Sequence, residues 1–258
     1  MRRMGCLLGL LAVALAGRAE IDPETILGVW LFDEGRGDVA ADSGPNGFDG
    51  FLHGAQWVDA KYKKGLAFDG NDWVEVPNDP KLQVGPELTM MALFYAEDIG
   101  DWRQLIAKSD EYLLRIDPPQ EGNRMSAFVK PGGNWEPRAS ASVPQLETWI
   151  HFAATYQADP PGGVDHLKVF VNGVRSGQST RPGAIAPTNN PVEFGRWGGG
   201  SYFVGIIDEV ALFSVALEEE DLRLIAENGL EAVLRGGLAV HPLGKLAVSW
   251  AALKASAR

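Results

Sequence analysis

Side-chain oxygens are concentrated in residues 28–77, where acidic and amide residues fill the turns between short apolar runs. The first of these turns is the loop at residues 33–50, whose oxygen-bearing side chains include Asp33, Glu34, Asp38, Asp42, Ser43, Asn46 and Asp49. Carboxylate and carbonyl oxygens are the ligands that calcium selects in proteins. The first chemistry that the sequence predicts is therefore the binding of a hard cation at this loop.

A second possible chemistry comes from tryptophans in polar loops. Three of the eight tryptophans lie in such loops, namely Trp102, Trp135 and Trp197, and the last stands beside Arg196. An aromatic ring can stack on a sugar while polar neighbours bond its hydroxyls, so these four residues are the predicted ligand-binding site. The alternative is that the rings only cover the rim of the domain, as large aromatics often do. The tryptophans of the predicted strands are expected in the core: Trp30, Trp57, Trp73 and Trp149.

The sequence shows no constellation expected of an enzyme. Glycoside hydrolases place two carboxylates across the scissile bond, and no predicted strand here carries alternating acids. The acidic run at residues 218–221 suits the start of a helix, where it complements the helix dipole. The four histidines have no metal-binding spacing, and the GxSxG and HExxH motifs are absent. We therefore predict no catalytic residue, and we expect His151, inside an apolar strand, to be a satisfied core histidine.

The elements that must position these residues are strands. Apolar or alternating runs follow one another at short spacing, and Asn172-Gly173 is a strong hairpin turn. The predicted strands are residues 28–32, 51–57, 65–68, 73–76, 88–96, 104–109, 112–116, 125–130, 149–156, 166–171, 174–179, 192–194 and 205–213. So many strands at this spacing favour an all-β, antiparallel β-sandwich over a βαβ fold.

One segment has helical character. Residues 217–226 begin with acids, end at Asn228-Gly229, and place Leu217, Leu222 and Ile225 on one side, which we expect to dock on the sandwich. Residues 230–258 are expected to form a C-terminal appendage, either a β-hairpin or a short helix. The main domain is therefore predicted to span residues 20–229.

Composition limits the class of protein. A chain of 258 residues with 45 % hydrophobic residues is long enough for one large all-β domain. Its formal net charge of -11 argues against nucleic acid as a partner, because phosphate binding needs a positive face. The 31 glycines and 16 prolines agree with a fold that has many turns.

The N-terminus has the features of an export signal. Arg2 and Arg3 precede an apolar run at residues 6–16 that ends in small residues, so we expect a signal peptide at residues 1–19. The run is too short to span a bilayer, although an uncleaved membrane anchor is the alternative. Cys6, the one cysteine, lies inside this signal, so no disulfide is expected in the mature chain. The predicted location is secreted or at the cell surface, with no membrane span.

Six short motifs in a fixed order carry a family resemblance. They are GVWLFDEG at residues 28–35, DSGPNG at 42–47, LAFDG at 66–70, WIHFAATY at 149–156, KVFVNG at 168–173 and GIIDEV at 205–210. Together they resemble the laminin-G-like (concanavalin A-like) jelly-roll domains of secreted bacterial proteins. The resemblance implies two stacked antiparallel sheets, often with one structural calcium at the rim.

Carried across residue by residue, the resemblance implies that Asp42, Asn46 and Asp208 are the calcium ligands. Strict alternation places Asp208 on the same strand face as Ile206 and Val210, where an unpaired charge is costly to bury. The alternatives are that Asp208 caps a loop or pairs with an arginine, and that Asp42 only makes an Asx-turn.

The function predicted from the sequence is a secreted binding or adhesion module with a structural calcium. Its ligand is expected to be a carbohydrate or another cell-surface or extracellular partner. One alternative is a glycoside hydrolase or lyase on the same fold, since related jelly rolls include such enzymes. Another is a purely structural module of a surface assembly.

Overall fold

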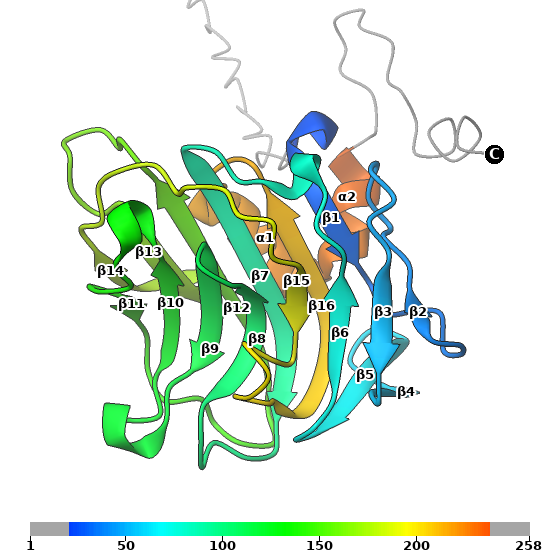
Figure 1. Ribbon diagram of the computed structural model, residues 1–258. Coiled ribbons are helices and arrows are strands. Elements are labelled where there is room, and N and C mark those ends of the chain that lie inside the picture. The colour runs from blue at the N-terminus through cyan, green and yellow to red at the C-terminus, as the bar shows by residue number, and fades with distance from the viewer. Residues whose placement is uncertain (1–20, 238–258) are drawn as a thin grey trace, which may run out of the picture.

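The computed structural model describes residues 21–237, and within them the chain forms two antiparallel sheets of eight strands each that lie face to face (Figure 1). This confirms the predicted all-β sandwich with a short helix near the C-terminal end. The predicted signal peptide and residues 238–258 of the predicted appendage lie outside the described residues.

The first sheet, which we call sheet A, is built around the long apolar strands. Its spatial order is β14 (Val174–Ser179), β13 (Leu167–Val171), β12 (Trp149–Gln157), β7 (Glu87–Ala96), β16 (Val204–Phe213), β5 (Lys64–Asp69) and β4 (Gln56–Asp59), and β1 (Ile26–Trp30) also pairs with β16.

The second sheet, sheet B, carries the shorter strands and lies in front in Figure 1. Its spatial order is β11 (Ala139–Ser140), β10 (Met125–Val129), β9 (Tyr112–Ile116), β8 (Arg103–Lys108), β15 (Val192–Phe194), β6 (Trp73–Val76), β3 (Gly50–His53) and β2 (Val39–Ala40). Four short 3-10 helices lie in the connections: Pro23–Thr25, Pro80–Leu82, Pro119–Glu121 and Pro131–Gly133.

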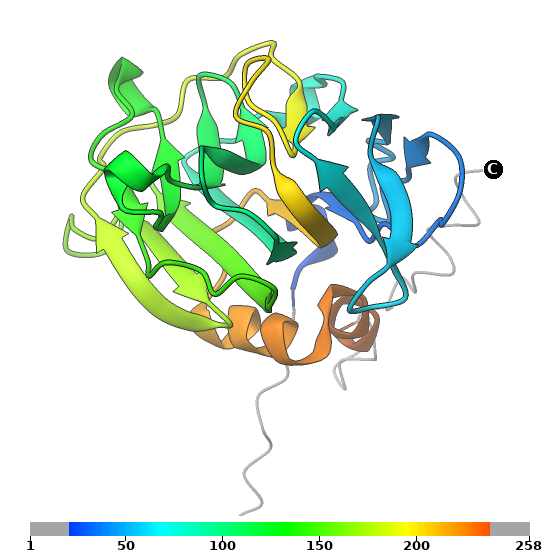
Figure 2. The ribbon, with the colours of Figure 1, turned by 90° about the horizontal axis from the view of Figure 1, so that it is seen from below.

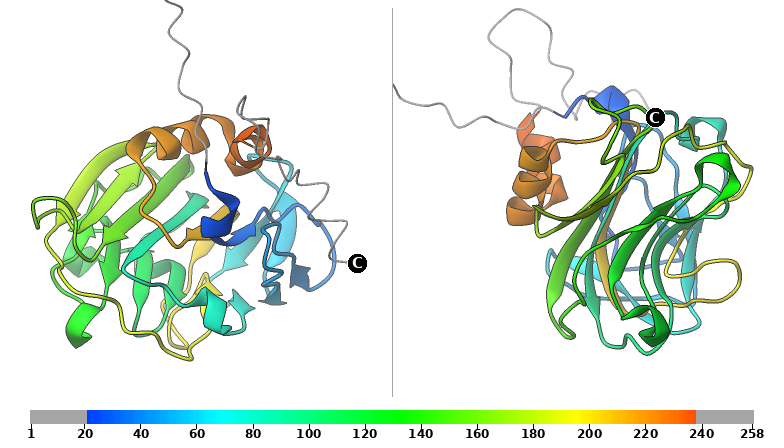
Figure 3. Two further views of the ribbon diagram at one scale, coloured as in Figure 1. Left: turned by 90° about the horizontal axis from the view of Figure 1, so that it is seen from above. Right: turned by 90° about the vertical axis from the view of Figure 1, so that its left-hand side faces the viewer.

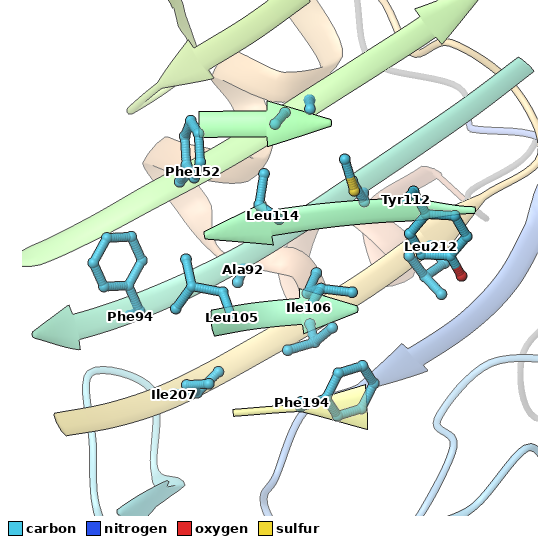
Figure 4. Close-up of a cluster of buried hydrophobic side chains, with 14 of the residues drawn as sticks. Ala92, Phe94, Leu105, Ile106, Tyr112, Leu114, Phe152, Phe194, Ile207 and Leu212 are labelled. Atoms are coloured by element: carbon cyan, nitrogen blue, oxygen red, sulfur yellow. The ribbon is translucent and has the colours of Figure 1, made fainter. Parts of the chain in front are cut away.

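The main core lies between the two sheets. Large side chains from both inner faces meet there with almost no exposed surface, among them Phe94 and Phe152 of sheet A and Leu114 and Phe194 of sheet B (Figure 4). Trp30 of β1 is fully buried and meets Phe194 edge to face at 4.8 Å between ring centroids. Burial of these apolar surfaces is the dominant contribution to the stability of such a sandwich.

The outer face of sheet A is covered by helices, which lie on that side of the sandwich (Figure 3). Helix α1 (Glu219–Asn228) and helix α2 (Leu230–Gly237) bury an apolar row against strands β7, β12, β13 and β16: Leu222, Ile225, Leu230 and Leu234. Because both faces of sheet A are covered, residues 90–96 of β7 form a continuous apolar run instead of alternating with polar residues. The segment that follows Gly229 thus begins with a helix that packs on the sandwich.

One predicted strand is wrong. Residues 51–57 were expected to form one strand, but the chain turns at Gly54 and passes from β3 in sheet B to β4 in sheet A (Figure 2). Gly54 has φ +92°, and a Cβ there would lie 2.0 Å from Asp72 Oδ1, so only glycine fits this turn. The two-residue strands β2 and β11 were not predicted, because pairs this short carry no periodic signal.

The alternation expected around Asp208 is also wrong. The pairing of β16 with β7 shifts register between Ile207 and Val210, and both of these residues face the core. Asp208 and Glu209 therefore lie together in a bulge opposite Leu93. A bulge adds one residue to a strand, and the alternating pattern of the sequence cannot show where that happens.

Candidate functional site

In the described part of the chain no α-helix covers the outer face of sheet B, and this face gathers polar and aromatic side chains. Pairing of the strands aligns one residue from each into a row across this face, from Val39 of β2 through Phe51, Glu75, Glu193, Ala107 and Leu113 to Phe128 of β10. Alternate residues of a strand point to the same face, so this row and its flanking loops form the candidate site.

Two tryptophans cover the apolar end of the row. Trp135 and Trp197 pack on a small cluster made by Ala107, Leu113 and Phe128. Their rings meet edge to face, with centroids 6.0 Å apart and planes at 81°. Both residues are half-buried, so each ring keeps a part that is open to solvent.

The loops that carry these rings are held by specific contacts. Trp197 and Gly200 exchange backbone hydrogen bonds of 3.1 Å in both directions around a two-glycine turn, in the loop that links β15 to β16. Such turns need positive φ at both central residues, which glycine supplies. The loop of Trp135 is anchored by the buried Arg181, which donates to the carbonyls of Val129, Asn134 and Glu136.

Arg196 lies beside the tryptophan pair, over another aromatic ring. Its guanidinium stands 3.8 Å from the ring centroid of Trp73, whose ring stacks on His53 at 4.3 Å. It forms an ion pair with Glu193 and lies 3.9 Å from Glu75. Glu75 and Glu193 face each other directly on neighbouring strands, so Arg196 offsets the repulsion between them.

A charged cluster continues the site toward β9 and β10. Asp117, which is 1 % exposed, accepts hydrogen bonds from Arg115 at 2.8 Å and from Arg138 at 2.9 Å. Both guanidinium groups stand over the ring of Phe128, at 4.4 and 4.9 Å from its centroid. Glu121 pairs with the same two arginines. We call these four charged residues the ionic cluster.

Trp102 belongs to the same region through Glu121. Burial raises the pKa of Glu121, but hydrogen bonds from Arg138 and Trp102 and the charges of both arginines outweigh it and bring the pKa below its usual range. Trp102 itself is 42 % exposed. The four residues predicted to bind a ligand, Trp102, Trp135, Arg196 and Trp197, thus all lie over sheet B.

Sequence reasoning missed much of this site. Trp73 was expected in the core, but it is half-buried and contacts Arg196, Tyr202 and His53 instead. The charged residues of the face were not predicted either, because they come from strands and loops far apart in the sequence: Glu75, Arg115, Asp117, Glu121, Arg138 and Glu193. Of the other strand tryptophans, Trp30 is in the core as expected, whereas Trp57 and Trp149 are only half-buried.

Asp42 and Asn46 fasten their loop to the first strand. Asp42 Oδ1 accepts from the backbone N–H of Val29 at 2.9 Å and of Gly44 at 2.7 Å, and its Oδ2 accepts from Phe48 at 3.0 Å. Asn46 donates its amide to the carbonyls of Ile26 and Leu27 at 2.9 and 3.1 Å. Burial raises the pKa of Asp42 even against these donors.

Asp208 lies at a different backbone segment. Its Oδ2 accepts from the N–H of Tyr62 at 2.7 Å, and its buried Oδ1 has no partner within the described residues. Burial raises the pKa of Asp208 to about 8. Its neighbour Glu209 accepts the N–H of Leu230 at the start of α2, and burial raises the pKa of Glu209 to about 7.

The three residues implied as calcium ligands do not fit one site as they stand. Both carboxylate oxygens of Asp42 already accept hydrogen bonds from backbone N–H groups. Asn46 donates its side-chain amide to backbone carbonyls, and Asp208 accepts from Tyr62 in a different loop. Among the described residues, no group of three or more His, Cys, Asp or Glu side chains is arranged to hold a metal ion. The calcium site therefore stays a prediction from the sequence.

His151 is buried as predicted but is not satisfied. It is 4 % exposed in β12, and neither ring nitrogen has a hydrogen-bond partner in the described structure. Burial, followed by the charge of Lys61, lowers the pKa of His151 to about 4. The ring is therefore neutral at pH 7.

Comparison with known families settles the relationship of this fold. Residues 68–223 match the Laminin_G_3 family model, described as the concanavalin A-like lectin/glucanases superfamily. The chain belongs to this superfamily. The match confirms the resemblance seen in the sequence motifs, and the two stacked sheets agree with the jelly roll expected of a concanavalin A-like domain.

Solved structures show what this concanavalin A-like domain is similar to. Domain 4 of an extracellular arabinanase from Geobacillus stearothermophilus, in complex with arabinotriose, superposes with a TM-score of 0.60 at 18 % identity, over 78 % of this chain and 98 % of that one. The Trypanosoma rangeli sialidase, in complex with sialic acid, superposes with a TM-score of 0.57 at 17 % identity, over 81 % of this chain and 34 % of the sialidase chain. The binding domain of botulinum neurotoxin DC, in complex with SialylT, superposes with a TM-score of 0.58 at 10 % identity, over 80 % of this chain and 51 % of the toxin chain.

These likenesses show a shared fold. The chain spans nearly all of the arabinanase domain, but about half of the toxin domain and a third of the sialidase. No curated protein sequence matches the chain. None of the helices formed by residues 21–237 has the length and apolar character needed to cross a membrane. The concanavalin A-like fold occurs both in binding domains and in enzymes, so function must be argued from the site.

Proposed function

We propose that this protein is a carbohydrate-binding module and that its glycan lies on the outer face of sheet B. The observation that carries the proposal is the pair formed by Trp135 and Trp197, two half-open rings on an apolar floor with charged groups on either side. An aromatic face suits the C–H face of a sugar, and carboxylates and guanidinium groups suit its hydroxyls.

The relatives support a binding role. The arabinanase domain was solved with arabinotriose, the toxin domain with SialylT and the sialidase with sialic acid. Carried to this chain, these complexes support a sugar as the ligand class. They also support a role outside the cell, in line with the signal peptide predicted at residues 1–19. Sequencing the N-terminus of the exported protein tests that part, since it should begin near residue 20.

A glycoside hydrolase is the second candidate, and one observation favours it. Glu75 and Glu193 face each other across two strands on the proposed site, and paired carboxylates are what such enzymes use. However, both carboxylates are ion-pair partners of Arg196, whereas a glycosidase needs one of the two groups to deliver a proton. The arrangement therefore supports binding better than hydrolysis.

A glycan array tests the proposal directly. The protein should bind one class of glycan, and Trp135→Ala and Trp197→Ala should each weaken binding at least about tenfold, because each removes a central ring. Val174→Ala is a matched control: it removes apolar surface that is 59 % exposed, on β14 of the other sheet. Failure to bind any glycan, or equal loss with the control, would refute the proposal. Release of reducing sugar that stops in Glu193→Gln would favour the hydrolase instead.

A further inference from the structure

We infer that this site selects neutral glycans over glycans that carry carboxylates, such as those ending in sialic or uronic acids. The inference rests on the proposed function and names the ligand class of the same face. It follows from two features of the outer face of sheet B: the cations there already form ion pairs with carboxylates, and the carboxylates outnumber the cations.

Every cation that stands over a ring of the site has a carboxylate partner. Arg115 and Arg138 stand over Phe128 and pair with Asp117 and Glu121, the two carboxylates of the ionic cluster. Lys130 stands 5.2 Å from the centroid of Trp135 and forms a 2.5 Å ion pair with Asp110. Arg196 stands over Trp73 and pairs with Glu193.

The balance of charge at these pairs is negative. The four cations share six carboxylates, which are Glu75, Asp110, Asp117, Glu121, Glu136 and Glu193. The whole chain carries a formal charge of -11, so the surrounding field has the same sign. A sugar carboxylate placed here would meet like charge, and like charges in contact disfavour a complex.

The cations cannot easily be recruited away from their partners. Asp117 is 1 % exposed, and the Glu193 side chain is 8 % exposed. Turning Arg196 toward a bound anion would leave the Glu193 carboxylate almost buried without a counter-ion, which is strongly unfavourable. Turning Arg138 would take from the buried Asp117 one of its two arginine partners. An anionic sugar that recruited either arginine would therefore have to break an ion pair to a buried carboxylate in order to form its own.

A neutral sugar meets no such conflict. A hydroxyl group both donates and accepts, and an ionised carboxylate has lone pairs left after it has bonded an arginine. Hydroxyls can therefore bond to the outer oxygens of Glu75 and Glu136, whose side chains are 38 % and 56 % exposed, while every ion pair stays intact. The rings of Trp135 and Trp197 supply the apolar contact.

The test compares matched pairs of ligands on the full chain. Each neutral oligosaccharide on an array is placed beside the same oligosaccharide capped with sialic acid or with glucuronic acid, and dissociation constants are then measured for the best pair by calorimetry. We expect the neutral member to bind at least about tenfold more tightly, because specificity of this kind comes from unpaired or repelled charge in the wrong complex. We also expect its affinity to be insensitive to salt, because no net charge is neutralised.

A double variant sharpens the test. Glu75→Gln with Glu136→Gln removes the two exposed carboxylates and loosens the partners of Arg196 and Arg138, so the preference for the neutral ligand should shrink. Glu227→Gln, which removes an exposed partner of Arg223 on helix α1, is the control and should leave the preference unchanged. Equal or tighter binding of the capped ligand by the unaltered protein would overturn the inference while leaving glycan binding intact. Absence of binding to either member would instead overturn the proposed function.

Discussion

The buried environment of His151 makes the stability of the protein depend on pH. Its pKa is lowered by burial to about 4, and its ring nitrogens have no partners in the described structure. Between pH 6.5 and 4 the unfolded chain binds a proton at this histidine that the folded chain excludes, so acidification favours unfolding. This contribution is absent at pH 7 and amounts to about 2 kcal/mol at pH 5, from a histidine of ordinary pKa about 6.5.

We therefore predict that His151→Leu changes the pH dependence of stability. Relative to the unaltered protein, the variant should gain about 2 kcal/mol of unfolding free energy on going from pH 7 to pH 5, because the lost proton site no longer opposes folding. Urea denaturation at the two pH values measures this difference. His53→Leu, at an exposed histidine, is the control. A difference from the unaltered protein that is the same at both pH values would contradict the account.

At the scale of elements, the loop between β1 and β2 is fixed by one carboxylate. Asp42 accepts three backbone N–H groups from Val29, Gly44 and Phe48, and it thereby ties the loop to the first strand. Removal of a buried acceptor leaves its donors unpaired, and each buried unpaired donor lowers the unfolding free energy by about 1–3 kcal/mol. Water that reaches a donor reduces this cost.

We predict that Asp42→Ala lowers the unfolding free energy by about 2–4 kcal/mol. The loss should be the same with and without a calcium chelator, because the carboxylate oxygens are already hydrogen-bonded to backbone N–H groups. Thermal and urea unfolding in both conditions measure it. Asp38→Ala, an exposed acid in the same loop, should change stability little. If Asp42→Ala were costly in the presence of calcium and nearly neutral under chelation, the predicted metal site would be supported instead.

Element type followed well from the sequence, whereas the position of each side chain on its face did not always follow. The apolar run of β7 and the Asn-Gly turn after β13 were predicted because their signals are local. The crossover at Gly54 and the bulge at Asp208 depend on which distant strand lies alongside, so the pattern of one strand cannot show them. Of the three implied calcium ligands, Asp208 lies in this bulge, whereas Asp42 and Asn46 bond to the backbone around the first strand.

At the scale of the whole molecule, the two sheets have different outer faces. Helices α1 and α2 cover sheet A (Figures 1 and 3). Sheet B instead presents half-open aromatics and paired charges. The sequence placed four of the site residues in loops, and the fold brought all four to sheet B. The sequence could not show the ionic cluster, because Arg115 and Arg138 come together only after β9 and β10 have paired and the loop after β10 has folded back.

The central claim is the location of the glycan, and the tryptophan side chains report on it directly. In a two-dimensional ¹H–¹⁵N spectrum, each indole N–H gives one signal, which can be assigned by single Trp→Phe substitutions. On addition of a neutral oligosaccharide that binds, the signals of Trp135 and Trp197 should shift. Those of Trp30, which lies in the main core, and of Trp57, which packs against it, should stay in place, because their indoles donate to the carbonyls of Phe48 and Gly37. Saturable binding that leaves the Trp135 and Trp197 signals unmoved would contradict the account.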